Sequence, residues 1–290
     1  MTIQTVNVGW GWNDGKGMLV SYHDTDEVMK RMLGEKQELW ECGIIQVACE
    51  NFLKKSKVVL DIGSHIGCFS LQARHYNNDC SIICFEPQKE MYKVLEKNIK
   101  QNKLKNIKTY NCAVGDSNKK VKIANQINDG SNSGEVYDYH GEKEYNFGGV
   151  SLGEGTEERD MITIDSLNLE SCEFMKIDVE GYEFFVLCGA EETIRKYKPT
   201  IFFEHNNYDD NNEIVTPSKY MMEICNEKSS KEFSNHEGNI FSLLKSYGYN
   251  WFQRFGPNYL AKYCIFQADE GEVHLGHNEE LLEYMIYGGA

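Results

Sequence analysis

The segment Val58–Ser70, VVLDIGSHIGCFS, constrains the fold more than any other part of the chain. A short apolar, β-branched run predicts a strand ending at Asp61, glycines follow at positions 63 and 67, and a helix is predicted soon after. Glycine permits close approach of a ligand to the backbone, and a helix start offers free N–H groups. The spacing lacks the GxGxxG of a dinucleotide fingerprint, which disfavours a nicotinamide-dependent enzyme.

Strands and helices alternate along the rest of the chain. Apolar runs predict strands at 57–62, 81–85, 107–112, 174–179 and 200–204. Amphipathic patterns predict helices at 70–76, 88–101, 183–196 and 239–246. Alternation of this kind predicts an α/β fold with a parallel sheet covered on both faces. Two further runs, 250–255 and 260–266, flank Gly256-Pro257-Asn258 and predict an antiparallel hairpin at the sheet edge.

The chain of 290 residues is near the upper size for one hydrophobic core, so one elaborated domain is expected. We expect three parts: an N-terminal cap or substrate region at 1–50, a central domain at 51–268 and an acidic C-terminal tail at 269–290. The cap is predicted to contain a helix at Glu27–Trp40.

Two polar stretches interrupt the predicted domain. The excursion 125–160 is rich in Gly, Asn, Ser and Glu, and long excursions of this kind often carry function. The insertion 207–238 is acidic and polar, with one short helix predicted at Lys219–Cys225.

Charge and cysteine usage restrict partners and location. The formal net charge of −15 repels phosphate backbones and anionic lipids, so a small molecule is a better partner than nucleic acid or a membrane. The start has no basic or long apolar segment, and no run reaches the 18 apolar residues of a membrane span, which predicts a soluble protein without a secretory signal. The ten cysteines form no CxxC pair, so we expect them all reduced, in the cytoplasm.

The ends of the second and third predicted strands suggest a nucleoside pocket. Glu86 directly follows the run SIICF and precedes Pro87, and a carboxylate at this place can accept both hydroxyls of a ribose. At the third strand, Cys112, Ala113 and Val114 offer small side chains against which an adenine could lie flat.

The chain resembles the FkbM family of S-adenosylmethionine-dependent methyltransferases. The motifs that carry the resemblance span residues 38–266 in consistent order: DIGSHIG, FEP, NCAVGD, NFGGVS, TID, KIDVEGYE, LCGAEETI and KPTIFFE. It implies a Rossmann-like class I methyltransferase fold, with a seven-stranded, mostly parallel sheet whose last two strands form the predicted hairpin. It also implies that S-adenosylmethionine is held by Asp61, Gly63, Ser64, His65, Gly67, Glu86, Pro87, Cys112, Ala113 and Val114.

The chain departs from the family at Ser64-His65, where Ala-Asn is common. Two interpretations of His65 stay open. Its side chain donates or accepts a direct hydrogen bond with the cofactor, or it packs beside the cofactor without changing its protonation state. The segment Asn146–Ser151 is expected to act as a lid, and the residues assigned to the substrate or lid are Asn146, Gly148, Gly149, Ser151 and Glu180.

Methyl transfer to an alcohol needs alignment and a proton acceptor or a divalent cation. Asp178 follows one predicted strand, Glu204 and His205 end the next, and strand ends of an open α/β sheet meet at one crevice. These three are the expected catalytic residues, with Mg²⁺ on Asp178 and Glu204 as a weaker hypothesis.

The expected function is O-methylation, by S-adenosylmethionine, of a hydroxyl on a sugar, glycan or other polyhydroxylated small molecule, the acceptor class coming from the resemblance. A nicotinamide-dependent oxidoreductase and a catalytically degenerate partner protein are the alternatives. An RNA cap methyltransferase is disfavoured by the charge and by the lack of a recognisable lysine-centred catalytic set.

Overall fold

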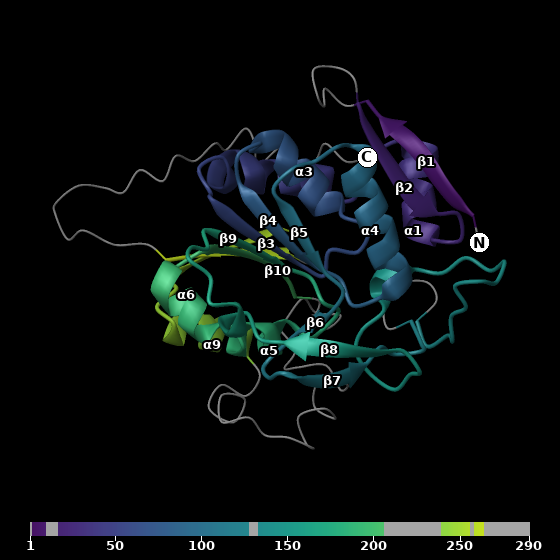
Figure 1. Ribbon diagram of the computed structural model, residues 1–290. Helices are drawn as coiled ribbons and strands as arrows, with labels where there is room; N and C mark the ends of the chain where they lie inside the picture. The colour runs from purple at the N-terminus through teal and green to yellow at the C-terminus, as the bar shows by residue number, and fades with distance from the viewer. Residues whose placement is uncertain (1, 10–16, 128–132, 206–238, 256–257, 264–290) are drawn as a thin grey trace.

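A seven-stranded sheet forms the centre of the protein (Figure 1). The computed structural model describes residues 2–9, 17–127, 133–205, 239–255 and 258–263. The strands, in the order β11-β12-β10-β9-β3-β4-β5, are Trp251–Phe255, Asn258–Lys262, Thr200–Glu204, Phe174–Ile177, Val58–Ile62, Ser81–Phe85 and Ile107–Tyr110. Strand β12 runs antiparallel to β10 and β11, and the other pairs are parallel. The predicted mostly parallel sheet with its C-terminal hairpin is therefore confirmed.

Helices cover both faces of the sheet. One face carries α2 (Cys42–Ala48), α3 (Cys68–Tyr76) and α4 (Lys89–Gln101), and the other carries α5 (Glu183–Cys188), α6 (Glu191–Tyr197) and α9 (Ile240–Ser246). Successive strand residues face opposite layers: Leu60 and Ile62 join the core beneath α5, whereas Val59 joins the core beneath α3. Burial on both faces explains why these strands are continuous apolar runs.

The helix predicted over 183–196 is wrong as one element, because the chain forms two helices separated at Gly189 and Ala190. At Gly189 a Cβ atom would lie 1.9 Å from the carbonyl oxygen of Gly115. The Gly189 carbonyl also accepts a hydrogen bond of 3.0 Å from the Asp165 N–H. The helix is therefore interrupted at Gly189, where the backbone packs against the segments at Gly115 and Asp165.

The N-terminal region differs from the prediction in two ways. The predicted helix Glu27–Trp40 is shorter: α1 (Glu27–Met29) continues in wider, π-helical turns (Lys30–Lys36) that end before Gln37, which has φ of 57°. An antiparallel pair, β1 (Ile3–Val8) and β2 (Met18–His23), was not predicted. It docks on α4, where the Asn98 side chain accepts from the Ser21 N–H at 2.7 Å and donates to the Ser21 carbonyl at 3.0 Å.

The polar excursion contains more regular structure than its composition predicts. A small three-stranded sheet has the order β6 (Ala113–Val114), β8 (Glu158–Ile162) and β7 (Lys119–Lys122). The first residues of β8 are the last residues of the excursion. Within the excursion Phe147 is fully buried, and its ring contacts the rings of Tyr137, Tyr139 and Tyr145. The Asn146–Ser151 segment is therefore anchored in a core.

Several predictions fall outside the described residues: the insertion 207–238 with its helix at 219–225, the tail 269–290 and part of the hairpin turn, 256–257. The division into three parts stays a prediction. The eight cysteines in the described ranges are free thiols, and Cys225 and Cys264 lie outside those ranges.

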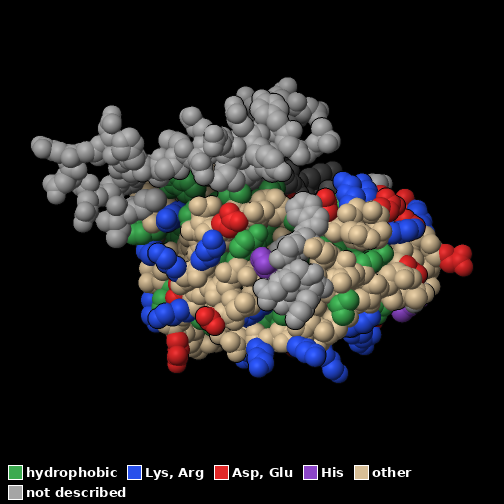
Figure 2. Space-filling view, turned by 90° about the horizontal axis from the view of Figure 1, so that it is seen from above, with side chains coloured by type: hydrophobic (Ala, Val, Ile, Leu, Met, Phe, Trp, Pro, Cys, Tyr) green, Lys and Arg blue, Asp and Glu red, His purple; other side chains and the backbone are tan. Residues whose placement is uncertain are grey.

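The surface of the described part carries charges of both signs. On the face in Figure 2, Lys and Arg side chains lie in separate groups with Asp and Glu between them. Among the helices that the structure describes, none has the length and apolar character needed to cross a bilayer. That nucleic acid is not a partner stays a prediction.

Candidate active site

A cavity of about 360 Å³ opens where the sheet changes its winding direction. The chain leaves β3 toward α3 on one face and leaves β9 toward α5 on the other, and such a switch point is the usual ligand crevice of an open α/β sheet. The cavity is lined by the segments after β3, β4 and β9, by the last residue of β10, by residues 112–114, by the N-terminal region around residues 27–45, and by residues 146–152.

The turn after β3 brings two strand ends into close contact. Gly63 has φ of 77°, and a Cβ atom there would lie 1.7 Å from the Asp178 carbonyl oxygen. The N–H groups of Gly63 and Ser64 both donate to the Phe85 carbonyl at 3.0 Å. The absence of a side chain at Gly63 therefore allows the segments that follow β3 and β9 to lie close together. The turn itself forms one wall of the cavity.

Two predicted cofactor residues, Asp61 and Gly67, do not line the cavity. Asp61 is fully buried beneath it, accepts a hydrogen bond of 2.5 Å from the Ser70 hydroxyl and has its pKa raised by burial. Gly67 has φ of 93°, a backbone conformation that favours glycine, and a Cβ atom there would lie 2.7 Å from the end of the Leu95 side chain on α4. Both residues therefore support the conformation of the turn, and other residues of the turn face the cavity.

Glu86 presents its buried carboxylate to the cavity. Its Oε2 accepts from the His65 N–H and its Oε1 from the Gln88 N–H, each at 2.7 Å. Burial raises the pKa of Glu86 to about 7, against the opposing effect of His65. Each carboxylate oxygen has a second lone pair, so two hydroxyls of a ligand can still be accepted.

A small apolar wall lies beside Glu86. The residues of this wall are Ile62, Phe85, Cys112, Ala113 and Val114. Pro87, Ser64 and His65 also line the cavity, so eight of the ten predicted cofactor residues surround one space. Their assignment to a cofactor stays a prediction.

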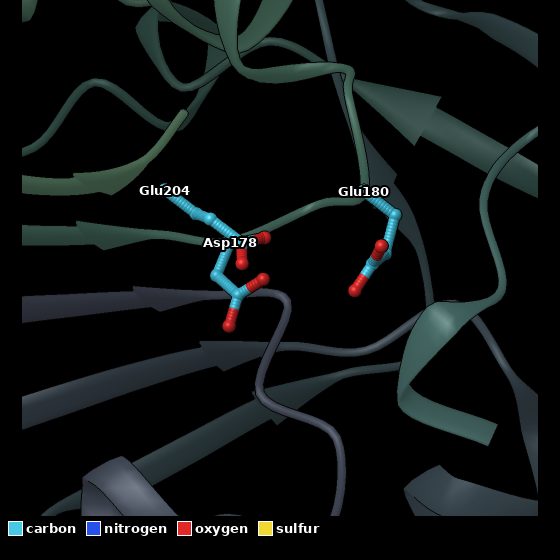
Figure 3. Close-up of side chains that lie close together, drawn as sticks. All are labelled: Asp178, Glu180 and Glu204. Atoms are coloured by element: carbon cyan, nitrogen blue, oxygen red, sulfur yellow. The ribbon is translucent and has the colours of Figure 1, made fainter. Parts of the chain in front are cut away.

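Three carboxylates of the cavity lining gather beyond the ends of β9 and β10, and β3 separates these strands from β4 and Glu86 (Figure 3). Asp178 directly follows β9, Glu204 ends β10, and Glu180 lies in the next turn with φ of 55°. Their nearest oxygens lie within 4.8 Å of one another. Burial, and then the neighbouring Asp178, raise the pKa of Glu204 well above its ordinary value, which favours the neutral form of this side chain.

The sequence reasoning missed Lys176, which lies between the acidic residues. Its side chain is 8% exposed and its Nζ lies 3.1 Å from Asp178 and 3.8 Å from Asp61. Nζ also donates to the Gly63 carbonyl at 2.7 Å. Burial lowers the pKa of Lys176, but the two carboxylates raise it to a net value above the ordinary one, so this lysine is charged. A lysine inside the apolar run FMKI was the available signal.

Glu41, from the N-terminal region, was also missed. It lines the cavity, and its carboxylate accepts a hydrogen bond of 2.6 Å from Asn258 of β12. Burial and the Asp178 charge raise its pKa to about 7. No local pattern predicts this contact, because 217 positions separate the two residues.

The structure does not bring His205 to the acidic cluster. Its buried ring packs against Phe241 of α9 and Tyr259 of β12, and it is not among the residues that line the cavity. Adjacent residues at a strand end point to opposite sides, so Glu204 and His205 cannot both face the cavity. Of the lid residues, Asn146, Gly148 and Ser151 line the cavity and Gly149 does not.

The strand order, the terminal antiparallel hairpin and the cavity at the switch point define a Rossmann-like class I methyltransferase fold. The sequence model of the methyltransferase FkbM domain matches residues 61–250, more than half of the chain. The chain therefore belongs to the FkbM methyltransferase family, which favours methyl transfer over the oxidoreductase alternative.

Comparison with solved structures gives distant similarities. A methyltransferase FkbM from Methylobacillus flagellatus KT is 16% identical, with a TM-score of 0.44, and the match covers 72% of this chain. It covers 44% of the other chain, so this chain spans less than half of that protein. A SAM-dependent methyltransferase from Aquifex aeolicus is 14% identical, with a TM-score of 0.38 and coverage of 83% and 95% of the two chains. Comparison with curated proteins finds no match.

Proposed function

We propose that the protein transfers a methyl group from S-adenosylmethionine to a hydroxyl of a sugar, glycan or other polyhydroxylated small molecule in the cytoplasm. The observation that carries the proposal is the division of one cavity into two chemically different sides. Glu86 and most of the apolar wall follow or end β4 and β5, whereas the carboxylates of Asp178, Glu180 and Glu204 follow or end β9 and β10, on the other side of β3.

The first side fits S-adenosylmethionine. Glu86 would accept the two ribose hydroxyls, and Ala113 and Val114 would contact the adenine, because a carboxylate suits a diol and small apolar side chains suit a flat ring. Bound in this way, S-adenosylmethionine would supply an electrophilic methyl group on sulfur.

The second side suits an acceptor with several hydroxyls. Asp178 is the proposed proton acceptor, and Glu204, whose raised pKa favours the protonated form, would donate a hydrogen bond to another acceptor oxygen. A second version of the proposal places Mg²⁺ on Asp178 and Glu204, where carboxylate oxygens would be suitable ligands. Activity that is lost with a chelator and restored by Mg²⁺ would favour the metal version.

The proposed activity can be tested with S-adenosylmethionine labelled in its methyl group and a panel of monosaccharides, nucleotide sugars and oligosaccharides. Mass spectrometry should find the label on one acceptor. No transfer to the panel, together with binding of S-adenosylhomocysteine, would contradict the proposed acceptor class and support the alternative of a catalytically degenerate partner protein.

Replacing Glu86 with alanine should weaken the binding of S-adenosylhomocysteine by about 1–3 kcal/mol, or 5- to 150-fold, because charge-assisted hydrogen bonds to the ribose are lost. Glu86→Gln is the matched control. It keeps one oxygen acceptor and the side-chain volume, so its affinity should lie between those of Glu86→Ala and the parent. Calorimetry measures all three, and equal affinities would show that Glu86 does not contact the ribose.

A further inference from the structure

We propose that His65 is a positioning residue for the ribose-binding carboxylate, joining Glu86 to Asp26 of the N-terminal region so that donor affinity depends on an intact Asp26–His65–Glu86 chain. This inference rests on the proposed function. It concerns His65, within the glycine turn after β3.

The geometry of His65 gives it two links. Its backbone is left-handed, with φ of 49°, and its N–H donates to Glu86 Oε2 at 2.7 Å. Its ring Nε2 lies 3.4 Å from Asp26 Oδ2, and neither atom has a hydrogen-bond partner among the described residues. The backbone link orients Glu86, and the ring link is an ion pair only when the imidazole is protonated.

Asp26 is a rigid anchor for the ring. It is 1% exposed, and its Oδ1 caps α1 by accepting from the Met29 N–H at 3.0 Å. The backbone on either side of it is bound to Tyr145: the Glu27 N–H donates to the Tyr145 carbonyl and the Tyr145 N–H donates to the Thr25 carbonyl, each at 2.9 Å. Asp26 therefore connects the N-terminal region to the start of the lid segment.

Further hydrogen bonds lead from Glu86 back to Asp26, so that these residues form a closed network. Gln88 donates its N–H to Glu86 Oε1 at 2.7 Å and its side-chain amide to the Phe147 carbonyl at 2.9 Å. Phe147 is two residues beyond Tyr145, so the path returns to Asp26. The contact between His65 and Asp26 is the one link of this network whose strength depends on the charge of the imidazole, because the remaining links are hydrogen bonds from N–H donors that do not titrate.

The charges around His65 favour its protonated form. Burial lowers the pKa of His65, whereas Asp26 and Glu86 raise it and Lys176 of β9 lowers it, with a net value above the ordinary one. His23, at the end of β2, also faces this group, but burial lowers the pKa of His23, so it adds little charge at neutral pH. The attraction between the imidazolium and the Glu86 carboxylate therefore favours the state in which both groups are charged.

The affinity for the donor should depend on pH in two directions. On the acid side, protonation of Glu86 removes the acceptor for the ribose, and affinity should fall. On the alkaline side, deprotonation of His65 removes the ion pair with Asp26, and affinity should fall again. Since His65 lowers the pKa of Glu86, loss of the imidazolium should also move the acid limb to higher pH.

The test is calorimetric titration of S-adenosylhomocysteine between about pH 5.5 and 9.5 with the parent, His65→Asn and Asp26→Asn. Asparagine tolerates the left-handed backbone and keeps the N–H that binds Glu86, and it is a good N-cap at position 26. Both variants should bind about 5-fold more weakly than the parent near neutral pH and lack the alkaline limb. Thermal unfolding checks that they are folded.

A purely structural role would leave the shape of the pH profile unchanged in the variants. If folded His65→Asn or Asp26→Asn keeps the parental alkaline limb, the inference is overturned while the proposed function stands. If the parent does not bind S-adenosylhomocysteine at any pH, the proposed function fails and the inference fails with it.

Discussion

Replacing Asp178 with asparagine should lower the rate of methyl transfer by about 10²- to 10⁴-fold, the usual effect of removing a positioned proton acceptor. Asparagine keeps the shape of the side chain but cannot take the acceptor's proton. The affinity for S-adenosylhomocysteine should change little, because Asp178 follows β9, which β3 separates from β4 and Glu86. Single-turnover rates and calorimetry measure the two effects separately.

Glu204→Gln is the matched control for Asp178→Asn. Because burial raises the pKa of Glu204 and favours its neutral form, an amide in its place should reduce the rate far less than the change at Asp178. His205→Ala should leave the rate near that of the parent, since the ring packs among aromatic residues outside the cavity. Parental turnover in Asp178→Asn would show that another group accepts the proton.

Lys176→Met should destabilise the fold by about 3–5 kcal/mol, the usual cost of removing one partner from a buried ion pair. The substitution leaves the carboxylates of Asp61 and Asp178 without their cation, and Asp61 is fully buried. Urea denaturation at neutral pH measures the loss. It should appear as a lower midpoint with an unchanged slope.

The double variant Lys176→Met/Asp178→Asn separates the charge effect from the loss of packing. If the lysine acts by neutralising its neighbours, the double variant should be more stable than the sum of the two single changes predicts. Additive effects would show that Lys176 contributes through packing alone.

The sheet could be predicted from sequence because each of its strands has a local signal. The break at Gly189 could not, since contact with the Gly115 carbonyl causes it. The pair β1 and β2 was missed for a similar reason: its attachment depends on Asn98, far along the chain. Tertiary contacts override local propensity at both places.

The candidate site was predictable where it depends on strand ends. Glu86, Asp178 and Glu204 face the cavity because each follows or ends a parallel strand. His205 follows Glu204 immediately, and the twofold alternation of a strand already argues against both facing one cavity. Asp26 and Glu41 come from the N-terminal region, whose packing no local pattern indicates.

Parallel calorimetric titrations with S-adenosylhomocysteine and NAD⁺ decide whether the cavity is a methyl-donor site. They require no knowledge of the methyl acceptor and compare the methyl-donor site with the nicotinamide alternative in one experiment. We expect binding of one S-adenosylhomocysteine per chain and no binding of NAD⁺. Binding of NAD⁺ without binding of S-adenosylhomocysteine would contradict the assignment of the cavity to a methyl donor.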